Sequence, residues 1–576
     1  MRRSPASGLA LVLALVAPVV AAPSKKHPIT VTPGVPMRAA DIRPYTPPSL
    51  PPEPALEPSE VKAVEITVPE TIIAIRPWSS PMVGSAILGA RLPVRGVVQA
   101  RGRGCSGKVW YAVEPFGYVC SREAKPTAQP TTSEQVLKVA EGERLPFHYV
   151  MVLVKEGDKV PMWSTFDALK QGAEPERQLE RGDTVAIARP LTYDGEKYWL
   201  SVDGNVLPQK GVPMMGPGSA WHGLALDETT PLPFGWVTPE KAPAYEAIPE
   251  GKAPPPTQTI ERRTRVKIEE EQTVGKKRWL KVSVIGIDPS PLSPSPSPSP
   301  TPTPSTSPSP SPSPSPSFPA TSPSTSTSPS PSPSPSTSTS TSTSTSTSTS
   351  LWISADSVNE VRLLARPPTV PPDIERWIDV DLGEQVLVLY EKDKPVFATL
   401  VSSGRAIPTP MGTYPVWAKV GAITMKNQPY EDKGYYVNKV PWSTFFQWHN
   451  AIHGAYWHDK FGVVKSHGCV NTAPLDARRV FEWVSPELPP GWTGLRPLEL
   501  LKSPYVVVRN SHGKKEFRQD RPVGPPDREL EGQRLEEAEK RRADEAAKVE
   551  AAAVPAPNAP PVPAPSATPP PPLPTP

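Results

Sequence analysis

A histidine and a cysteine late in the chain have the residue types and surroundings of an acyl-transfer site. Cys469 follows His453 by 16 residues and lies in the run 466–471, which reads SHGCVN. A thiol becomes a strong nucleophile when a nearby imidazole removes its proton, and a glycine turn can aim backbone N–H groups at a developing oxyanion. The sequence therefore predicts thioester chemistry at Cys469, with His453 as its base.

The residues after the cysteine predict a helix. Apolar side chains recur there at the spacing of one helix face; they are Ala473, Ala477, Val480, Phe481 and Val484. Thr472 is the expected N-cap, and Pro474 falls in the first turn. Cys469 would then lie just ahead of a helix N-terminus, whose positive end, with the imidazole, is expected to lower the pKa of the thiol.

The stretch 371–510 around this pair has a globular and mostly β composition. Successive strands are predicted at 377–382, 385–390 and 396–401, with turn residues between them. A rigid turn at 408–414 leads into a further strand. We expect a β-rich domain with a short helix after the cysteine.

Four segments of this stretch resemble, in order, the YkuD-type L,D-transpeptidase catalytic domain over roughly 375–510. They are 378–382 (IDVDL) with Gln385, the glycine turn 403–404 (SG), the run 408–412 (PTPMG), and 452–454 (IHG) with 466–471 (SHGCVN). One segment alone would be a weak signal. Four in the same order make the resemblance specific.

The resemblance implies a reaction on bacterial cell-wall peptide. Cys469 would be the nucleophile and His453 the general base, oriented by the Gly454 carbonyl. The thiol would attack the carbonyl of the third residue of a peptidoglycan tetrapeptide stem and release D-alanine as a thioester forms. An amine of a second stem would then take the acyl group, with no cofactor.

The resemblance also implies supporting residues around the nucleophile. His467, Gly468 and the Cys469 amide would shape the oxyanion site, and Ser466 and Asn471 would support the substrate loop. Two alternatives stay open at this point. The same residues would serve an L,D-carboxypeptidase or hydrolase that passes the acyl group to water, and a noncatalytic wall-binding scaffold is the other possibility.

Histidines are concentrated in this region, since four of the eight in the chain lie between 449 and 467. His449 and His458 fit no role that the resemblance implies, and we expect ordinary surface or packing residues. His449 and His453 have the spacing of the histidines in zinc proteases, but Asn450 stands where those enzymes need a glutamate base. We therefore predict no metal site.

The N-terminus has the three-part form of a secretory signal. It reads MRR, then an apolar run at 9–20, then Ala21, Ala22 and Pro23. We expect a signal peptide at 1–21, because cleavage after Ala22 would place Pro23 beside the cut bond. The alternative, a membrane anchor, needs about twenty apolar residues. We expect an exported protein of the periplasm or cell envelope, with no transmembrane segment after cleavage.

Three cysteines in an exported chain leave one unpaired. Cys105 and Cys120 lie on either side of the strand-like run 108–113 and are the candidates for a disulfide. Cys469 would then be the free thiol. The alternative is that the first two are buried and reduced.

Three N-terminal segments each contain a short predicted strand with a tryptophan, at 108–113, 197–202 and 277–282. They weakly resemble bacterial SH3-like domains, which are small β-barrels. The expected modules span 71–125, 145–215 and 217–366. The resemblance implies binding of wall peptide or glycan, and the alternative is that the modules are spacers or docking surfaces.

The other segments are of low complexity. Residues 22–70 are expected to be a proline-rich linker, and 511–576 a charged and proline-rich tail in which 528–553 is a solvated helix or disordered. The Ser/Pro/Thr tract 288–350 interrupts the third module. We expect a disordered insertion in a hairpin, because Trp352 would supply the missing partner strand; an interdomain spacer is the alternative.

Charge excludes one class of partner. The net charge of the chain is +4, and no run of Lys and Arg is interleaved with aromatic residues. Nucleic acid is therefore not an expected partner. The expected partners are peptidoglycan stem peptides and the cell wall.

Overall fold

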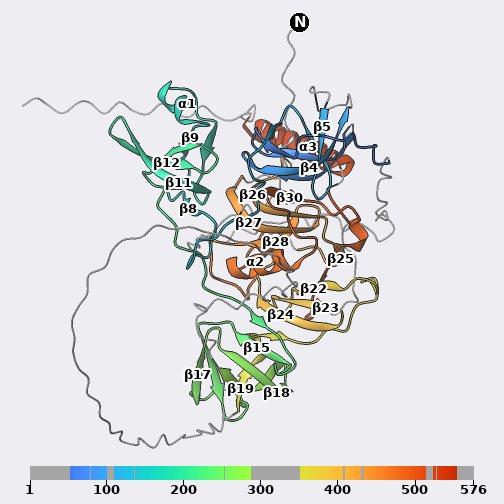
Figure 1. Ribbon diagram of the computed structural model, residues 1–576. Coiled ribbons are helices and arrows are strands. Elements are labelled where there is room, and N and C mark those ends of the chain that lie inside the picture. Colours follow the sequence, from blue (N-terminus) through green and yellow to red (C-terminus); the bar gives the residue numbers. More distant parts are fainter. Residues whose placement is uncertain are drawn as a thin grey trace, which may run out of the picture.

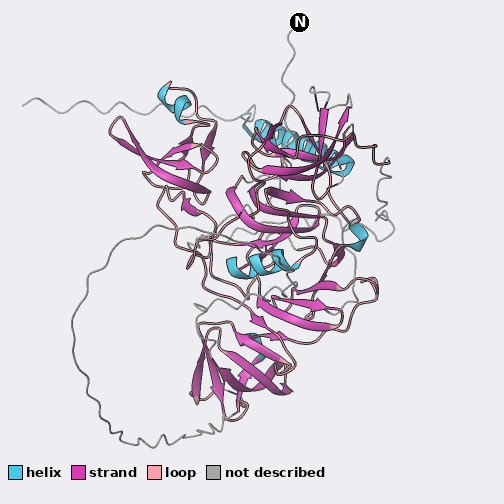
Figure 2. Cartoon of the chain, in the orientation of Figure 1, coloured by secondary structure: helices cyan, strands magenta, loops and turns pink. Residues whose placement is uncertain are grey.

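A computed structural model of the chain describes residues 52–553 except 78, 100–104, 106–108, 135–136, 252, 287–349, 406–408, 430–433, 514–522 and 527. The expected signal peptide, the linker up to residue 51, the Ser/Pro/Thr tract up to residue 349 and the tail beyond 553 lie outside the described residues. Most described elements are strands, as Figure 2 shows. The predicted mainly β fold is confirmed.

Residues 371–510, here called the catalytic region after the expected chemistry, contribute all strands except β14 to a six-stranded sheet in the order β14-β24-β23-β22-β31-β25. Its strands are β14 (Leu224–Ala225), β22 (Arg376–Asp381), β23 (Val386–Glu391), β24 (Lys394–Leu400), β25 (Gly412–Pro415) and β31 (Tyr505–Arg509). The three strands predicted between 377 and 401 are present as β22, β23 and β24. β22 and β31 run parallel at the centre of the sheet, with Ile378 opposite Val506.

A second sheet carries the cysteine and the histidine. Its members from the catalytic region are β26 (Ala418–Lys426), β27 (Tyr436–Gln447), β28 (Asn450–Gly454), β29 (Val470–Thr472) and β30 (Trp492–Leu495). Helix α2 (Pro474–Trp483) follows β29. A buried apolar core joins the two sheets and this helix, and it includes Ile378, Leu389, Phe446, Ile452, Val470, Val480 and Val506.

Helix α2 begins one residue later than expected. Its N-cap is Ala473, and no side chain caps it. Thr472 is the last residue of β29, and its hydroxyl donates a hydrogen bond to the His453 carbonyl at 3.1 Å. The sequence-based assignment of Thr472 as the N-cap was wrong because β29 continues through Thr472, whose backbone pairs with Gly454 of β28, so the helix starts only after it.

Three groups of strands precede the catalytic region. The first group is β1 (Ala63–Ile66), β2 (Thr71–Arg76), β3 (Ser79–Ala86), β4 (Arg91–Gln99), β5 (Val109–Val113), β6 (Tyr118–Cys120) and β7 (Ala124–Thr127). The second is β8 (His148–Met151), β9 (Val160–Met162), helix α1 (Phe166–Lys170), β10 (Arg177–Leu179), β11 (Thr184–Tyr193), β12 (Glu196–Ser201) and β13 (Val206–Pro208). Their assignment as SH3-like modules stays a prediction.

The third group, here called the third module, forms a seven-stranded sheet in the order β17-β16-β20-β19-β18-β15-β21. Its elements are β15 (Phe234–Val237), β16 (Lys241–Tyr245), β17 (Gln258–Glu261), β18 (Arg265–Val274), β19 (Lys277–Gly286), β20 (Leu351–Ser354), the 3₁₀ turn η2 (Ala355–Ser357) and β21 (Val358–Val361). β19 and β20 pair antiparallel, with Leu280 opposite Ile353. The chain on either side of the Ser/Pro/Thr tract therefore meets in one sheet.

The N-terminal strand groups are not independent of the catalytic region, because strands before residue 371 pair with strands of that region. β3 pairs with β30, β11 pairs with β27, and β14 pairs with β24. Residues 217–226, expected in the third module, thus pack on the catalytic region. In Figure 1 the third module lies against the β22–β24 side of that region, and β4 and β5 lie toward its other end.

The C-terminal charged segment is a helix, α3 (Arg528–Ala553). It is not fully solvated, because Ala538 is buried and the Arg534 guanidinium lies 4.6 Å from the Trp448 ring centroid. The remaining short element is the 3₁₀ turn η3 (Leu500–Lys502). Among the described residues, no helix has the length and apolar character needed to cross a membrane.

Cys105 and Cys120 form a disulfide with a Cα–Cα distance of 5.6 Å. It joins the chain before β5 to the end of β6. Cys469 is a free and buried cysteine. The disulfide between Cys105 and Cys120 therefore belongs to the first group of strands and not to the catalytic region.

A buried ion-pair cluster fixes the centre of the six-stranded sheet. Arg509 on β31 contacts both carboxylate oxygens of Asp379 on β22, at 2.8 and 2.7 Å, and Asp381 at 2.7 Å. Burial raises the pKa of Asp379 to about 6, although the Arg509 charge acts in the opposite direction. The two carboxylates depend on one guanidinium.

Replacement of Arg509 by leucine is therefore expected to destabilise the fold by about 3 kcal/mol or more, because two buried carboxylates lose their counter-charge. Urea unfolding followed by tryptophan fluorescence measures the change. Arg478→Leu is the matched control, since Arg478 pairs with Glu482 on the exposed surface of α2, and a shift within about 0.5 kcal/mol is expected. Equal shifts for the two variants would contradict the assignment.

Candidate active site

The two parallel strands β28 and β29 bring the cysteine and the histidine together. His453 lies opposite Asn471 in their register, and Cys469 directly precedes β29. Cys469 Sγ accepts the N–H of Ala451, which lies two residues before His453 on β28, so the thiol lies against the strand that carries the histidine. The chain between His453 and Cys469 forms the connection from one strand to the next.

The thiol of Cys469 is completely buried, with 0% exposure. Its Sγ accepts a hydrogen bond from the Ala451 N–H at 3.0 Å and lies 3.7 Å from the His449 carbonyl oxygen, to which it donates. Burial raises the pKa of the thiol well above its ordinary value, and the Ala451 N–H offsets only part of that effect. The expectation of a lowered pKa was wrong: strand β29 separates Cys469 from the start of α2, and removal from water dominates.

The imidazole of His453 is also 0% exposed. Its Nδ1 lies 3.4 Å from the Gly454 carbonyl oxygen, as the resemblance implies. A carbonyl only accepts hydrogen bonds, so Nδ1 carries the proton and Nε2 carries the lone pair. Nε2 is buried and has no hydrogen-bond partner in the described part of the chain.

Burial lowers the pKa of His453 to about 4, and the bond to Gly454 acts weakly in the opposite direction. The ring is therefore neutral at neutral pH. A neutral imidazole with an unoccupied Nε2 can accept a proton. Thiol and imidazole are therefore both buried and neutral.

The turn 466–469, here called the catalytic turn after its expected role, is fixed by one hydroxyl. Ser466 Oγ donates to the Cys469 carbonyl at 2.5 Å and accepts the Gly468 N–H at 3.1 Å. Gly468 has φ +138°, a backbone conformation that side-chain-bearing residues rarely adopt. His467 is half-buried, and its ring stacks on Tyr435 at 6.0 Å between centroids. Because Ser466 occupies the Gly468 N–H in this state, the role of Gly468 at an oxyanion site stays a prediction.

The segments that carry the family resemblance meet at this turn. Gln385 donates to Ser403 Oγ at 2.7 Å and accepts the Ser403 N–H at 2.8 Å. The Ser403 carbonyl in turn accepts the Ser466 N–H at 2.9 Å, and the Gly404 N–H donates to Thr409 Oγ1 at 3.0 Å. Four segments distant in sequence therefore build one support for the nucleophile.

Two histidines without an expected role also lie at this site. The His458 ring contacts the Asn471 side chain at 3.0 Å, and its Nδ1 accepts the Lys460 N–H at 3.2 Å. The His449 ring contacts Glu531 of α3 at 2.5 Å. The sequence showed only that histidines are concentrated in this region. It could not show their partners, because Asn471 lies on another strand and Glu531 on helix α3.

Within the residues that the structure describes, no group of three or more His, Cys, Asp or Glu side chains is arranged to hold an ion. Asn450 lies on β28 between the two histidines of the zinc-like spacing.

Comparison with known proteins identifies the region. Residues 375–500 match the sequence model of the YkuD family, whose description is L,D-transpeptidase catalytic domain. No curated protein matches the chain.

Solved structures of L,D-transpeptidases also match. The NMR structure of the catalytic domain from Enterococcus faecium L,D-transpeptidase has 27% identity, covers 23% of this chain and 95% of that chain, and has a TM-score of 0.19. A crystal structure of a mutant of the E. faecium enzyme has 26% identity, with 23% and 49% coverage and a TM-score of 0.18. An L,D-transpeptidase from Mycobacterium smegmatis has 16% identity, 28% and 73% coverage, and a TM-score of 0.19.

The chain spans about half the length of the E. faecium protein in the crystal structures that it matches. The family match includes β22 to β30, and hence both Cys469 and His453. Residues 375–500 therefore match the L,D-transpeptidase catalytic domain of the YkuD type.

Proposed function

We propose that this protein is an exported L,D-transpeptidase that joins two peptidoglycan stem peptides through a thioester on Cys469. The observation that carries the proposal is the buried pair of a free thiol and a neutral imidazole with an unoccupied Nε2, inside the region that matches the catalytic domain family. Export rests on the predicted signal peptide.

The first half-reaction is acylation of the cysteine. His453 Nε2 takes the thiol proton as Sγ attacks the carbonyl carbon of the third stem residue. The carbon–nitrogen bond to the terminal D-alanine breaks, and the imidazolium returns the proton to the leaving amine. Because both partners start neutral, charge develops only as the bond forms, where backbone N–H groups of the turn can stabilise it.

The second half-reaction transfers the acyl group. An amine of a second stem attacks the thioester carbonyl, His453 removes a proton from that amine, and Sγ leaves and recovers it. The atoms balance without a cofactor. Since Cys469 and His453 are both 0% exposed, substrate entry requires covering segments to move away from the thiol.

The direct test is a mass spectrum of disaccharide-tetrapeptide after incubation with the mature protein, beside the Cys469→Ala variant. A cross-linked dimer that lacks one D-alanine is expected from the wild type, and a loss of at least about a thousandfold from the variant. Tripeptide alone would replace the proposal by an L,D-carboxypeptidase. Turnover that survives Cys469→Ala would contradict the assigned nucleophile.

The neutral state of the pair predicts a pH dependence of thiol reactivity. Burial raises the Cys469 pKa, so the thiolate is scarce at neutral pH and grows about tenfold per pH unit. Iodoacetamide alkylation is expected to accelerate at that slope between about pH 6 and 8, and a chelator is expected to change neither alkylation nor turnover. A rate independent of pH over this window would reveal a thiolate–imidazolium pair instead.

The three N-terminal strand groups are proposed to bind the wall. Full-length protein carrying Cys469→Ala is expected to sediment with purified sacculi even when soluble tetrapeptide saturates the catalytic site. The variant binds without turnover, and the soluble peptide removes the contribution of the catalytic domain. Protein that stays in the supernatant under this competition would reduce the strand groups to spacers or docking surfaces.

A further inference from the structure

The connection 455–466 between β28 and the catalytic turn is held from outside the catalytic domain. Arg262 donates to the Asp459 carbonyl at 2.7 Å, and Arg263 donates to the same carbonyl at 2.9 Å and to the Asp459 carboxylate at 2.6 Å. Both arginines lie in the turn between β17 and β18 of the third module. One residue of the connection therefore receives three hydrogen bonds from another module.

Arg263 adopts an uncommon backbone conformation in making this contact. Its φ is +66°, in the left-handed region, where a residue with a Cβ atom is disfavoured by roughly 1 kcal/mol or more. The Arg263 N–H is tied to the Val237 carbonyl at 2.6 Å, and its guanidinium lies 5.1 Å from the Trp221 ring. Such conformations persist where the surrounding contacts determine them.

Asn359 on β21 provides a second contact to the same connection. Its Nδ2 donates to the Gly462 carbonyl at 3.0 Å and also to the Glu384 carbonyl. Gly462 has φ +95°, and a Cβ atom there would lie 3.2 to 3.3 Å from Thr238 and Asn359. A glycine is therefore needed where the third module approaches the connection.

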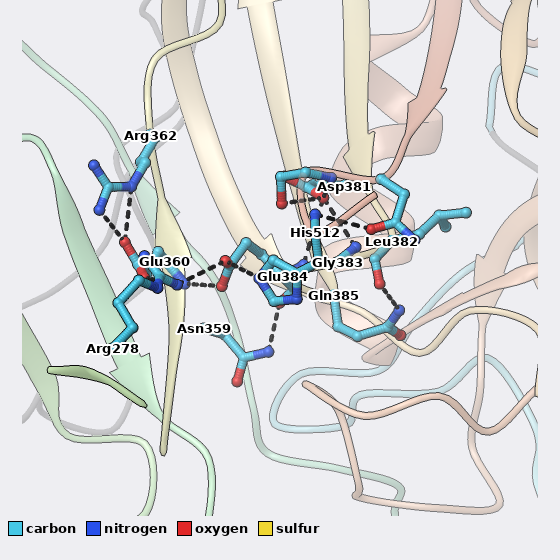
Figure 3. A network of polar contacts seen from close by, with 12 residues as sticks. Arg278, Asn359, Glu360, Arg362, Asp381, Leu382, Gly383, Glu384, Gln385 and His512 are labelled. Carbon is cyan, nitrogen blue, oxygen red and sulfur yellow. Dashed lines mark hydrogen bonds and ion pairs between the residues drawn. The ribbon is translucent and has the colours of Figure 1, made fainter. Parts of the chain in front are cut away.

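Glu384, which Asn359 contacts, lies in the turn between β22 and β23, as Figure 3 shows. Its carboxylate accepts the Glu360 N–H at 2.8 Å and contacts His512 at 2.6 Å. The buried Glu360 carboxylate lies between Arg278 at 2.6 Å and Arg362 at 2.5 Å. These side chains are paired with one another, so the network joins modules and does not offer an open ligand site.

The same turn leads to the nucleophile. The residue after Glu384 is Gln385, which holds Ser403, and the Ser403 carbonyl holds the Ser466 N–H. The third module thus contacts both supports of the catalytic turn, the connection 455–466 and the turn 382–385.

His458 links the connection to the site. Its Nδ1 accepts the Lys460 N–H, so the neutral ring must carry its proton on Nε2. Nε2 lies 3.0 Å from the amide of Asn471, and a donor there needs the amide oxygen as its partner. The oxygen and nitrogen of an amide are distinguished only by their partners, so we assign the Asn471 oxygen to face His458. Asn471 lies opposite His453 and two residues after Cys469.

We propose that the third module positions the catalytic centre. Arg263 and Asn359 fix the connection 455–466, and His458 in that connection holds the side chain of Asn471, which lies two residues after Cys469. The proposal rests on Cys469 being the nucleophile of the proposed function. The residues named are positioning residues, because none touches Sγ.

The test is made on the full-length protein with Arg263→Ala, Asp459→Ala and the double variant. Each is expected to lower kcat on tetrapeptide at least tenfold with KM within about twofold, and to accelerate iodoacetamide alkylation at least fivefold, because a released connection both misaligns and uncovers the thiol. The double variant is expected to be close to Arg263→Ala, because Asp459→Ala removes only the carboxylate contact, whereas Arg263→Ala removes that contact and one to the Asp459 carbonyl.

Controls separate positioning from general loss of structure. Lys241→Ala removes an exposed ion pair with Glu261 in the same module and is expected to leave both rates unchanged. His458→Gln, which keeps an N–H donor for Asn471, is expected to retain turnover within about threefold, whereas His458→Ala loses at least tenfold. Asp459→Asn provides a milder break if Arg263→Ala does not fold.

The outcomes distinguish this proposal from the proposed function. Wild-type rates of turnover and alkylation in Arg263→Ala and Asp459→Asn would overturn the positioning role while leaving the transpeptidase intact. Faster alkylation in these variants, together with a wild type that forms no cross-link, would support the positioning role and overturn the transpeptidase.

Discussion

The exclusion of water from Cys469 and His453 governs the rest of the catalytic region. A thiolate or an imidazolium in such a place loses its hydration, and burial is the largest influence on the pKa of both groups. Both groups therefore rest in their neutral forms, with the proton of His453 on the nitrogen that faces Gly454. The ionisation needed for attack must be produced during the reaction, as negative charge moves from sulfur to the substrate oxygen.

A site without fixed charges has to be positioned by hydrogen bonds, and the structure uses backbone groups for most of them. Ser466 closes the turn on the Cys469 carbonyl, Ser403 holds Ser466, and Gln385 holds Ser403. Each of these donors and acceptors is buried, so an unmade bond would cost about 1 to 3 kcal/mol. Each of the four sequence segments in the family resemblance supplies a partner to these contacts, since Thr409 in the remaining segment accepts the Gly404 N–H.

The sequence predicted what local patterns determine. The strands β22 to β24, the free Cys469 and the disulfide partners Cys105 and Cys120 follow from alternation, spacing and cysteine parity. The direction of the thiol pKa could not be predicted, because it depends on burial by segments far from Cys469 in the sequence. Thr472 is not the N-cap for a similar reason: it pairs with Gly454 of the distant strand β28, so β29 runs through it and the helix starts later.

The contacts between the third module and the connection 455–466 could not be predicted from the sequence either. Arg263, Asn359 and Asp459, which make them, belong to no recognised sequence pattern. Helix α3 is a further example, because its composition indicates a solvated segment while Glu531 reaches the His449 ring. Charged residues are frequent in any surface helix, and only the tertiary fold selects the few that meet a partner.

The boundaries of the family match do not coincide with the unit that holds the site. β31 begins at Tyr505, beyond the matched residues, yet it lies between β22 and β25 and carries Arg509, the counter-charge of Asp379. At the other edge, β14 pairs with β24 although the paired residues Leu224 and Ala398 lie 174 positions apart in the sequence. Asp476 at the start of α2 accepts the Gly223 N–H at 2.8 Å and the Thr399 hydroxyl at 2.5 Å. The helix that follows Cys469 is therefore anchored by one residue outside the match, Gly223, and one inside it, Thr399. The unit that holds the candidate site thus combines contacts within the matched residues with contacts from β14 and β31 outside them.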